Sequence, residues 1–271
     1  MHDTQNERDN RRIPINKVGI KHLVYPIMVL DRENKTQPTV ADISLYVDLP
    51  HHYKGTHMSR FVEVVNEHRG LVSLRSIEAI LGSIVERFDS LTAHLEIRFP
   101  YFVEKSAPVS GARSLMNYNC AFLASLDRRA RRRAAMDLIV EVAVPVATLC
   151  PCSKDISSAG AHNQRSQVII RTRSAALVWI EELIGLAEDS ASSGLYALLK
   201  RADEKHVTEH AYQHPRFAED VARMVAQRLC ADKRVIWFQV ESENSESIHN
   251  HNAYAMIEGA GPAAQRRRKR P

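Results

Sequence analysis

The chain has 271 residues, enough to bury a core as one large domain or two smaller ones. Its 37 Lys and Arg against 32 Asp and Glu give a formal net charge of +5, but five basic residues stand together at 266–270 and the rest is neutral. Because a short terminal charge run is usually solvated, we predict no nucleic-acid partner. Four cysteines are too few for a secreted disulfide scaffold. Residues 1–16 lack a signal-peptide core, and the apolar stretches are too short for a bilayer. We therefore expect a cytoplasmic protein with no membrane contact.

The first half of the chain combines strand patterns with one helix pattern. Residues 18–30 are rich in Val, Ile and Leu, and residues 39–49 alternate between apolar and polar side chains, so both predict strands. Residues 73–89 carry apolar side chains at three- and four-residue spacing, which predicts an amphipathic helix. Two further strands are expected at 92–104 and 115–126.

The second half of the chain also combines strand patterns with helix patterns. Strands are predicted at 137–148 and 167–172, and a helix at 175–189. A second helix is predicted over 215–229, with the proline at position 215 suited to its first turn. The last elements we expect are strands at 234–241 and 253–258.

Each half thus has two strands, helical material and two more strands, which indicates an internal duplication of an α+β unit with antiparallel sheets. We expect a disordered tail at 1–17, a first unit at 18–130, a second unit at 131–258 and a basic disordered tail at 259–271. The arginine-rich segment at 127–133 marks the seam, and we interpret it as a solvated linker. Antiparallel edge strands are a liability unless they are paired, so the subunits are expected to associate.

One loop, Leu149–Arg165, concentrates the reactive side chains Cys150, Cys152, Lys154 and His162. Thiolate and imidazole are ligands that Zn²⁺ and Fe²⁺ prefer, although two ligands make only half of a metal site. A nearby ammonium group can lower the pKa of a thiol, which suits Cys150 to metal binding or to nucleophilic attack. A bridge between Cys150 and Cys152 would need a local turn, because neighbours two apart point to opposite sides of an extended chain.

Other polar residues are less distinctive by themselves. Glu204 is an ordinary solvated charge by spacing, and Glu219 is a helical carboxylate in a first turn, where the helix dipole favours it. His249 precedes the last strand. Three histidines are spaced for one face of a helix, and we interpret them as an exposed face rather than a metal stripe: His206, His210 and His214.

Several separate motifs, in order along residues 18–258, resemble the type IB GTP cyclohydrolases. They are Gly55-Thr56-His57-Met58-Ser59-Arg60-Phe61, Leu149-Cys150-Pro151-Cys152-Ser153-Lys154, Gly160-Ala161-His162-Asn163-Gln164-Arg165, Asp203-Glu204-Lys205, Phe217-Ala218-Glu219-Asp220 and Glu246-Ser247-Ile248-His249-Asn250-His251-Asn252-Ala253.

The resemblance implies a tunnelling fold with two tandem ββααββ-like units per chain, which close into barrels when the chain forms a homotetramer. It implies the conversion of GTP and water into formate and 7,8-dihydroneopterin triphosphate, the first step of folate and pterin biosynthesis. It also implies a divalent metal, with Mn²⁺, Fe²⁺ and Zn²⁺ all suitable.

Site roles follow from the same resemblance. It makes Cys150, His162 and Glu204 metal ligands, and His249 a further ligand or an acid–base group. Glu219 would anchor the guanine, and Cys152 would lie beside the catalytic groups. The candidates for holding the triphosphate are Lys154, Arg165 and Arg60.

This chemistry suits these residue types. A metal lowers the pKa of bound water for attack on C8 of guanine, and histidine transfers protons near pH 7. A carboxylate accepts two N–H bonds from the N1 and N2 edge of guanine. Two alternatives stay open: a nitrile reductase of the 7-deazaguanine pathway, in which Cys150 is a nucleophile without metal, and a binding protein with a closed structural zinc site.

Overall fold

The computed structural model describes residues 5, 7–129 and 135–264. Parts of the expected N-terminal tail and of the arginine-rich seam, and the basic residues 266–270, lie outside the described residues. The chain divides into two compact units. The first unit comprises Met1–Pro100 and Ala121–Ile139, and the second comprises Tyr101–Cys120 and Val140–Pro271. No helix in the described part of the chain is long and apolar enough to cross a membrane.

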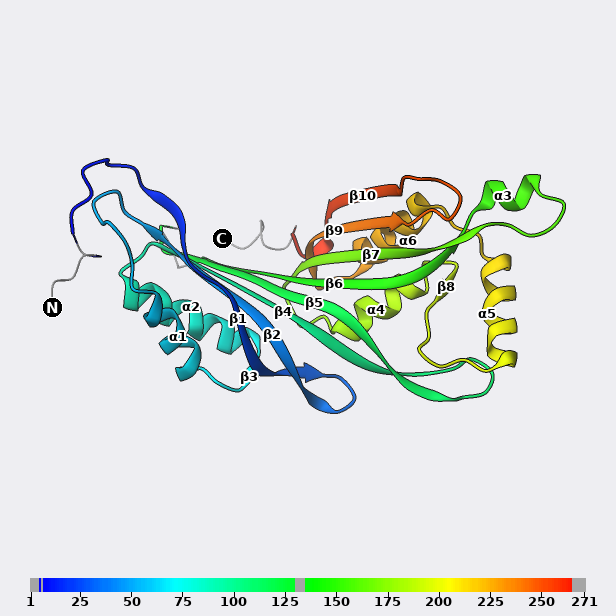
Figure 1. The fold of residues 1–271 in the computed structure, drawn as a ribbon, viewed down its shortest axis with the longest axis horizontal. Helices are drawn as coiled ribbons and strands as arrows, with labels where there is room; N and C mark the ends of the chain where they lie inside the picture. The colour runs from blue at the N-terminus through cyan, green and yellow to red at the C-terminus, as the bar shows by residue number, and fades with distance from the viewer. Residues whose placement is uncertain (1–4, 6, 130–134, 265–271) are drawn as a thin grey trace. The chain divides into compact units, whose positions relative to one another are not determined.

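The first unit is a sheet with two helices on it (Figure 1). Its strands follow the order β6-β5-β4-β2-β1-β3, and the long strands β4, β5 and β6 continue into the second unit. Gly19 lies between two register shifts of β1 against β2, and a Cβ there would collide with the Leu45 carbonyl oxygen. The elements are β1 (Ile15–Asp31), β2 (Lys35–Leu49), α1 (Met58–Glu67), β3 (Leu71–Val72), α2 (Leu74–Phe88), β4 (Thr92–Ser106), β5 (Arg113–Asp127) and β6 (Ala135–Leu149).

The two helices of the first unit cover its aliphatic core. Ser73 begins α2, because its hydroxyl accepts a hydrogen bond from the Ser76 amide at 3.3 Å. The buried face of α2 packs toward β2, and the rings of Phe61 on α1 and Phe88 on α2 stack at 4.2 Å between centroids. Ile84 and Val85 of α2 are fully buried, so apolar burial holds this layer together.

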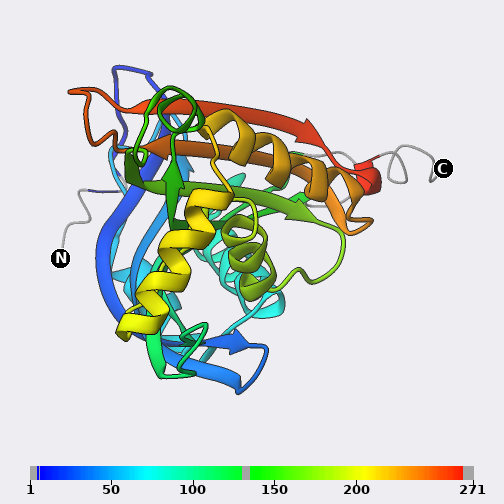
Figure 2. The same ribbon diagram turned by 90° about the vertical axis from the view of Figure 1, so that its right-hand side faces the viewer.

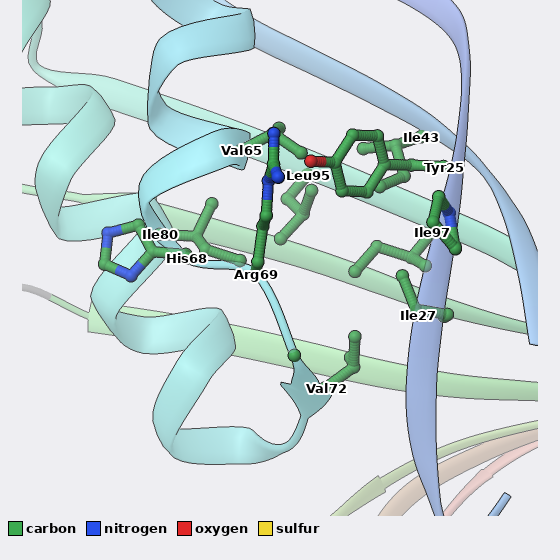
Figure 3. A pocket seen from close by; sticks show the side chains of 12 residues that line it. Tyr25, Ile27, Ile43, Val65, His68, Arg69, Val72, Ile80, Leu95 and Ile97 are labelled. Carbon is green, nitrogen blue, oxygen red and sulfur yellow. The ribbon is translucent and has the colours of Figure 1, made fainter. Parts of the chain in front are cut away.

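A small cavity lies under α1 in the first unit (Figure 3). Its volume of about 30 Å³ has room for roughly one water molecule. Most of the side chains around it are apolar, and at its edge the Tyr25 hydroxyl and the Arg69 guanidinium both donate to Asn66, at 2.8 and 2.9 Å. This cavity is therefore a packing feature.

The second unit is a sheet in the order β10-β9-β7-β6-β5-β4, with β8 paired to β6. Helix α6 packs on β9 and β10 through Val221, Val225 and Leu229, whereas α5 is exposed along most of its length (Figure 2). The elements are α3 (Pro151–Ile156), β7 (Asn163–Ser174), α4 (Ile180–Glu188), β8 (Ser193–Gly194), α5 (Arg201–Gln213), α6 (Ala218–Ala231), β9 (Val235–Asn244) and β10 (Ala253–Ala260).

The α+β class and every predicted strand are confirmed, with strand ends extended by a few residues. The helix expected at 175–189 begins only at Ile180, and the one expected at 215–229 begins at Ala218, so Pro215 lies outside its first turn. Strand β1 begins at Ile15, strand β10 reaches Ala260, and Ala263 is buried.

Three helices were not predicted. Helix α1 has no capping side chain and no acidic residue in its first turn, α3 has only six residues, and α5 is polar almost all round. Each lacks the apolar stripe or the capping signals by which a helix is found in a sequence.

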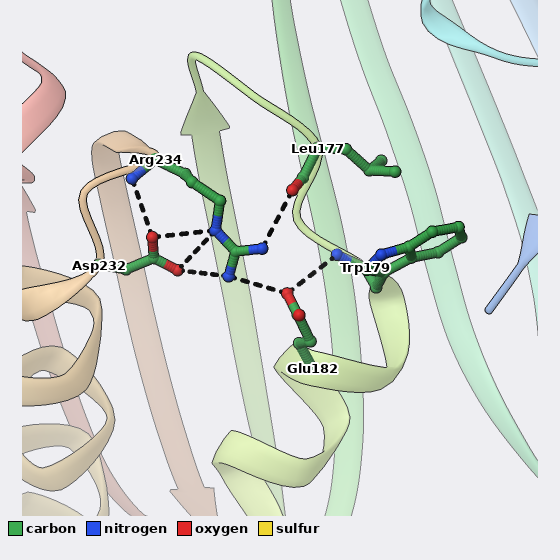
Figure 4. Close-up of polar contacts among 5 residues, drawn as sticks. All are labelled: Leu177, Trp179, Glu182, Asp232 and Arg234. Atoms are coloured by element: carbon green, nitrogen blue, oxygen red, sulfur yellow. Dashed lines mark hydrogen bonds and ion pairs between the residues drawn. The ribbon is translucent and has the colours of Figure 1, made fainter.

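Arg234 joins the turn after α6 to the beginning of α4 in the second unit (Figure 4). Its guanidinium donates to Asp232 at 2.7 Å and to the Leu177 carbonyl at 3.1 Å, and it pairs with Glu182 at 2.9 Å. Glu182 in turn accepts from the backbone amide of Trp179, which precedes the first turn of α4. The cluster is half-buried, so each contact is partly screened by solvent.

We expect Arg234→Ala to lower the free energy of unfolding by about 1–2 kcal/mol, because contacts to two half-buried carboxylates and to the exposed Leu177 carbonyl are lost. Both tryptophans, Trp179 and Trp237, lie in the second unit, so their fluorescence during urea unfolding reports this loss. The matched control is Arg223→Ala, whose guanidinium is 70% exposed and 3.6 Å from Asp220. It should change stability by less than about 0.5 kcal/mol. Equal effects of the two variants would contradict the role of the cluster.

The stability contributed by the Arg234–Asp232 ion pair depends on pH. Hydrogen bonds from Arg234 lower the pKa of the Asp232 carboxyl from its ordinary value. The unfolded chain therefore binds more protons than the folded one at acid pH, and the stabilisation is lost as the pH falls. The difference between wild type and Arg234→Ala should be complete above roughly pH 5 and shrink below about pH 4.

Candidate functional site

Several element ends meet at one edge of the second unit. Strand β6 ends at Leu149, β7 begins at Asn163 and α6 begins at Ala218. Backbone hydrogen bonds hold these ends together, so that the side chains at these ends surround one point. They run from the Cys150 amide to the His162 carbonyl at 3.1 Å, from the Arg216 amide to the Leu149 carbonyl at 3.0 Å, and from the Ser245 amide to the Arg165 carbonyl at 2.9 Å.

A hollow of about 270 Å³ opens at this edge. Four of the predicted site residues line it together: Cys150, His162, Glu219 and His249. They come from four parts of the chain, namely the end of β6, the start of β7, the first turn of α6 and the loop between β9 and β10. Because His251 and Glu246 also line it, the hollow unites a thiol, three imidazoles and two carboxylates.

Cys150 is positioned by the start of α3. It is the capping residue of that helix, Pro151 is the first helical residue, and the Ser153 amide donates to the Cys150 sulfur at 3.4 Å. Lys154 points to α5, where its ammonium donates to the Tyr212 carbonyl at 2.5 Å and lies 4.4 Å from the Tyr212 ring. The thiol is half-buried at the hollow.

His162 is held on both its backbone and its ring. Gly160 precedes it with φ of +79°, a conformation that suits glycine, and the His162 amide donates to the Ser153 hydroxyl at 3.1 Å. The ring Nδ1 lies 3.1 Å from Oε1 of Gln164 and 3.8 Å from Oε2 of Glu246. The loop after β9 is thus packed against this ring, and its His249 ring lies 6.5 Å away.

Glu219 and His249 form the more exposed side of the hollow. Glu219 is the second residue of α6, where the positive end of the helix dipole favours a carboxylate. His249 is exposed and stacks on His251 at 5.2 Å. Both side chains are accessible to a ligand that enters from solvent.

The other predicted site residues do not line this hollow. Cys152 is exposed on α3, Glu204 is exposed on α5, and Arg165 is exposed on β7. Arg60 belongs to α1 in the first unit. Within the described residues, no three His, Cys, Asp or Glu side chains are gathered closely enough to hold a metal ion.

The turn of α5 that carries Glu204 is firmly anchored by its neighbour Asp203. The buried Asp203 carboxylate accepts from the Ser110 hydroxyl at 2.6 Å, from the Val109 and Ser110 amides at 2.8 Å each, and from the Lys200 amide at 2.9 Å. These bonds, the Ser110 hydroxyl first, lower the pKa of the Asp203 carboxyl well below its ordinary value. Asp203 is therefore structural.

A second hollow of about 480 Å³ lies beside α5. The histidines expected on one helix face do share it, with centroid separations of 6.0 Å between His206 and His210 and 4.2 Å between His210 and His214. Burial, with His214 and His206 nearby, lowers the pKa of His210. Arg216 lines both hollows.

Five polar residues of the first hollow were given no role by the sequence analysis: Gln164, Arg216, Asn244, Glu246 and His251. Gln164 and Glu246 stand inside recognised motifs, and Arg216 immediately precedes one. A signal for Gln164 was present, because residues two apart on a strand point to the same side and His162 and Gln164 have this spacing. Nothing in the pattern around Asn244 distinguishes it.

Comparison with solved structures identifies the class of fold. The chain is similar to a uricase from Bacillus fastidious, with a TM-score of 0.57 at 7% identity over 94% of this chain and 95% of that one. It is also similar to the urate oxidase of Bacillus sp. TB-90, with a TM-score of 0.53 at 9% identity over 91% and 99% of the two chains. These are tunnelling-fold proteins, and the expected tunnelling fold is confirmed.

Sequence comparison identifies the family. The model of the family described as "Type I GTP cyclohydrolase folE2" matches residues 1–255. GTP cyclohydrolase FolE2 of Geobacter metallireducens is 53% identical over 258 residues, which cover 95% of this chain and 97% of that protein. The corresponding protein of Syntrophus aciditrophicus is 54% identical and is covered to 99%. The chain belongs to the type I GTP cyclohydrolase FolE2 family, which confirms the resemblance to the type IB enzymes.

Proposed function

We propose that this protein is a metal-dependent GTP cyclohydrolase, which converts GTP and one water into formate and 7,8-dihydroneopterin triphosphate at the first hollow. One observation carries the proposal. Four residues chosen from separate family motifs, Cys150, His162, Glu219 and His249, line a single hollow in a chain of this family. The product would feed folate and pterin biosynthesis.

Glu219 is proposed to bind the guanine. Its carboxylate has two acceptor oxygens, and the N1 and N2 edge of guanine presents adjacent N–H donors. The position supports this role because the first turn of α6 opens on the hollow. Adenine lacks this pair of donors, so Glu219 would also select the base.

A divalent metal is proposed to be held by Cys150 and His162, with Glu204 and His249 as further ligands. The donor set fits, because thiolate, imidazole and carboxylate together suit Zn²⁺, Fe²⁺ and Mn²⁺. Such a metal, when bound, lowers the pKa of a water molecule that attacks C8 of guanine. Glu204, on α5, is the one proposed ligand that does not line the hollow.

Other side chains are proposed to transfer protons and to bind the phosphates. His249, at the solvent side of the hollow, is proposed to move protons during ring opening and formate release, with Cys152 beside the site. Lys154, Arg165 and Arg60 are proposed to contact the triphosphate. All four cysteines are free, which supports work in a reducing compartment such as the cytoplasm.

The activity is tested by incubating metal-loaded protein with GTP and measuring formate, together with fluorescent neopterin after oxidation. We expect Cys150→Ala to abolish formate release and to lower the bound metal, with little change in unfolding, because the half-buried thiol adds little to the core. Metal content is measured by elemental analysis of the same sample. Turnover should need no NADPH, unlike the nitrile-reductase alternative.

The matched control for that variant is Cys230→Ala, since Cys230 is an exposed thiol on α6. It should keep both full activity and full metal content. Wild-type turnover by Cys150→Ala would refute the proposed metal site. If the wild type binds metal but releases no formate, the metal site is structural and the proposed enzymatic activity is rejected.

Glu219→Gln preserves the volume of the side chain but turns a donor toward the guanine N–H groups. We expect a loss of about 2–4 kcal/mol in transition-state binding, or roughly thirty- to a thousandfold in kcat/KM. Metal content should not change, because Glu219 is not a proposed ligand. The control is Glu209→Gln on α5, an exposed carboxylate outside the hollow, which should leave the kinetics unchanged. Near-wild-type kcat/KM for Glu219→Gln would place this carboxylate outside the site.

Assembly into a homotetramer, with sheets closing into barrels, is also proposed. It is supported by β10, which stands at one end of the strand order and exposes Tyr254 and Met256. An apolar edge strand of this kind invites pairing with another copy.

We expect light scattering to give the mass of four 30.7 kDa chains. A charge on the edge opposes strand pairing, so Met256→Glu should weaken association by roughly tenfold or more. Leu177→Glu replaces an apolar residue of similar exposure away from the edge and should leave the mass unchanged. An active monomer at assay concentration would contradict the proposal.

A further inference from the structure

Gln164 is a buried amide next to the proposed metal ligands. It stands near the start of β7, pairs across the sheet with Thr148 of β6, and is only 7% exposed. Its Nε2 donates to the Thr148 hydroxyl at 3.0 Å, and that hydroxyl lies 2.8 Å from the hydroxyl of Ser166. Thr148 and Ser166 are buried as well, so the amide is held by protein groups in a place where solvent offers little substitute.

The other end of this amide faces a histidine. With Nε2 turned to Thr148, the acceptor Oε1 lies 3.1 Å from Nδ1 of His162. The Glu246 carboxylate, a second acceptor, lies 3.8 Å from the same nitrogen. A ring nitrogen that faces two acceptors is favoured as a donor, so the proton of the neutral imidazole belongs on Nδ1 and the lone pair on Nε2.

We propose that Gln164 is a positioning residue that holds His162 in the Nδ1–H tautomer and thereby presents Nε2 as the coordinating nitrogen. The amide also fixes the plane of the ring, because Thr148 and Ser166 anchor it to two strands of the sheet. The link to metal binding rests on the proposed function, whereas the tautomer itself does not.

The contribution of such a positioning hydrogen bond to metal affinity can be measured. A histidine in the wrong tautomer carries a proton on the nitrogen that must bind the metal, and the metal then has to displace it. Loss of such a supporting hydrogen bond typically weakens metal affinity by about 10–100-fold. Gln164→Leu, which removes the acceptor at nearly constant volume, should show a loss in this range for Mn²⁺ or Zn²⁺ in competition with a chelator.

The direct test is the tautomer of His162 in the full-length, metal-free protein. Long-range ¹H–¹⁵N correlation spectra of histidine-labelled protein distinguish a protonated ring nitrogen from one with a lone pair. We expect Nδ1–H in the wild type, and a shift toward Nε2–H in Gln164→Leu. Gln164→Glu keeps an acceptor opposite Nδ1 and should restore the wild-type tautomer. An unchanged tautomer in Gln164→Leu would overturn the proposal.

Two further variants keep the test decisive. If Gln164→Leu does not fold, Thr148→Val removes the hydroxyl that holds the amide, and a mixture of tautomers is expected. The control is Thr172→Val on β7, the strand of Gln164, because the buried Thr172 hydroxyl makes no hydrogen bond within the described residues. It should change neither the tautomer nor the metal affinity. A single, unchanged tautomer in Thr148→Val would again overturn the proposal.

The two readouts also separate this inference from the proposed function. A changed tautomer with weakened metal affinity supports both. A changed tautomer with unchanged affinity supports the role of Gln164 and rejects His162 as a metal ligand. An unchanged tautomer rejects the role of Gln164, whatever the enzyme does with GTP.

Discussion

The site depends on closing the long connection between β6 and β7. The hydrogen bond from the Cys150 amide to the His162 carbonyl continues the antiparallel pairing of the two strands past Leu149 and Asn163. It brings together a thiol and an imidazole that are separated in sequence by α3 and a turn through Gly160. Without this closure the two groups would lie on a flexible loop, and the conformational entropy lost in ordering that loop would oppose ligand binding. The bonds from Arg216 and Ser245 extend the same closure to α6 and β9.

Rigid and accessible groups are divided between different elements. Gln164, Thr148 and Ser166 are buried in the sheet and form hydrogen bonds with one another, which gives the site a fixed base. Glu219 and His249 stand at a helix start and in a loop, where a substrate can reach them. Functional groups on loops supported by a rigid sheet are a common arrangement, because the sheet sets the geometry and the loops allow entry.

The fold alone does not decide the chemistry. Urate oxidases share it at 7–9% identity, so almost every side chain differs while the arrangement of elements persists. The family assignment comes from sequence similarity, and the site assignment comes from the residues at the ends of β6, β7 and β9.

The sequence by itself determined the strands, the duplicated α+β pattern and the family, because period-two alternation and local motifs are written in neighbouring residues. It also indicated Cys150 and His162 by their place in one reactive loop, but Glu219 and His249 only through resemblance, since Glu219 looks like any helical carboxylate. Tertiary structure alone decided that these four share one hollow, while Glu204 and Cys152 stand outside it. It alone revealed the contact of Gln164 with His162 and the hydrogen bonds by which Asp203 anchors α5. The physical reason is that hydrogen bonds between distant segments depend on how strands are paired in space, and no local pattern records that pairing.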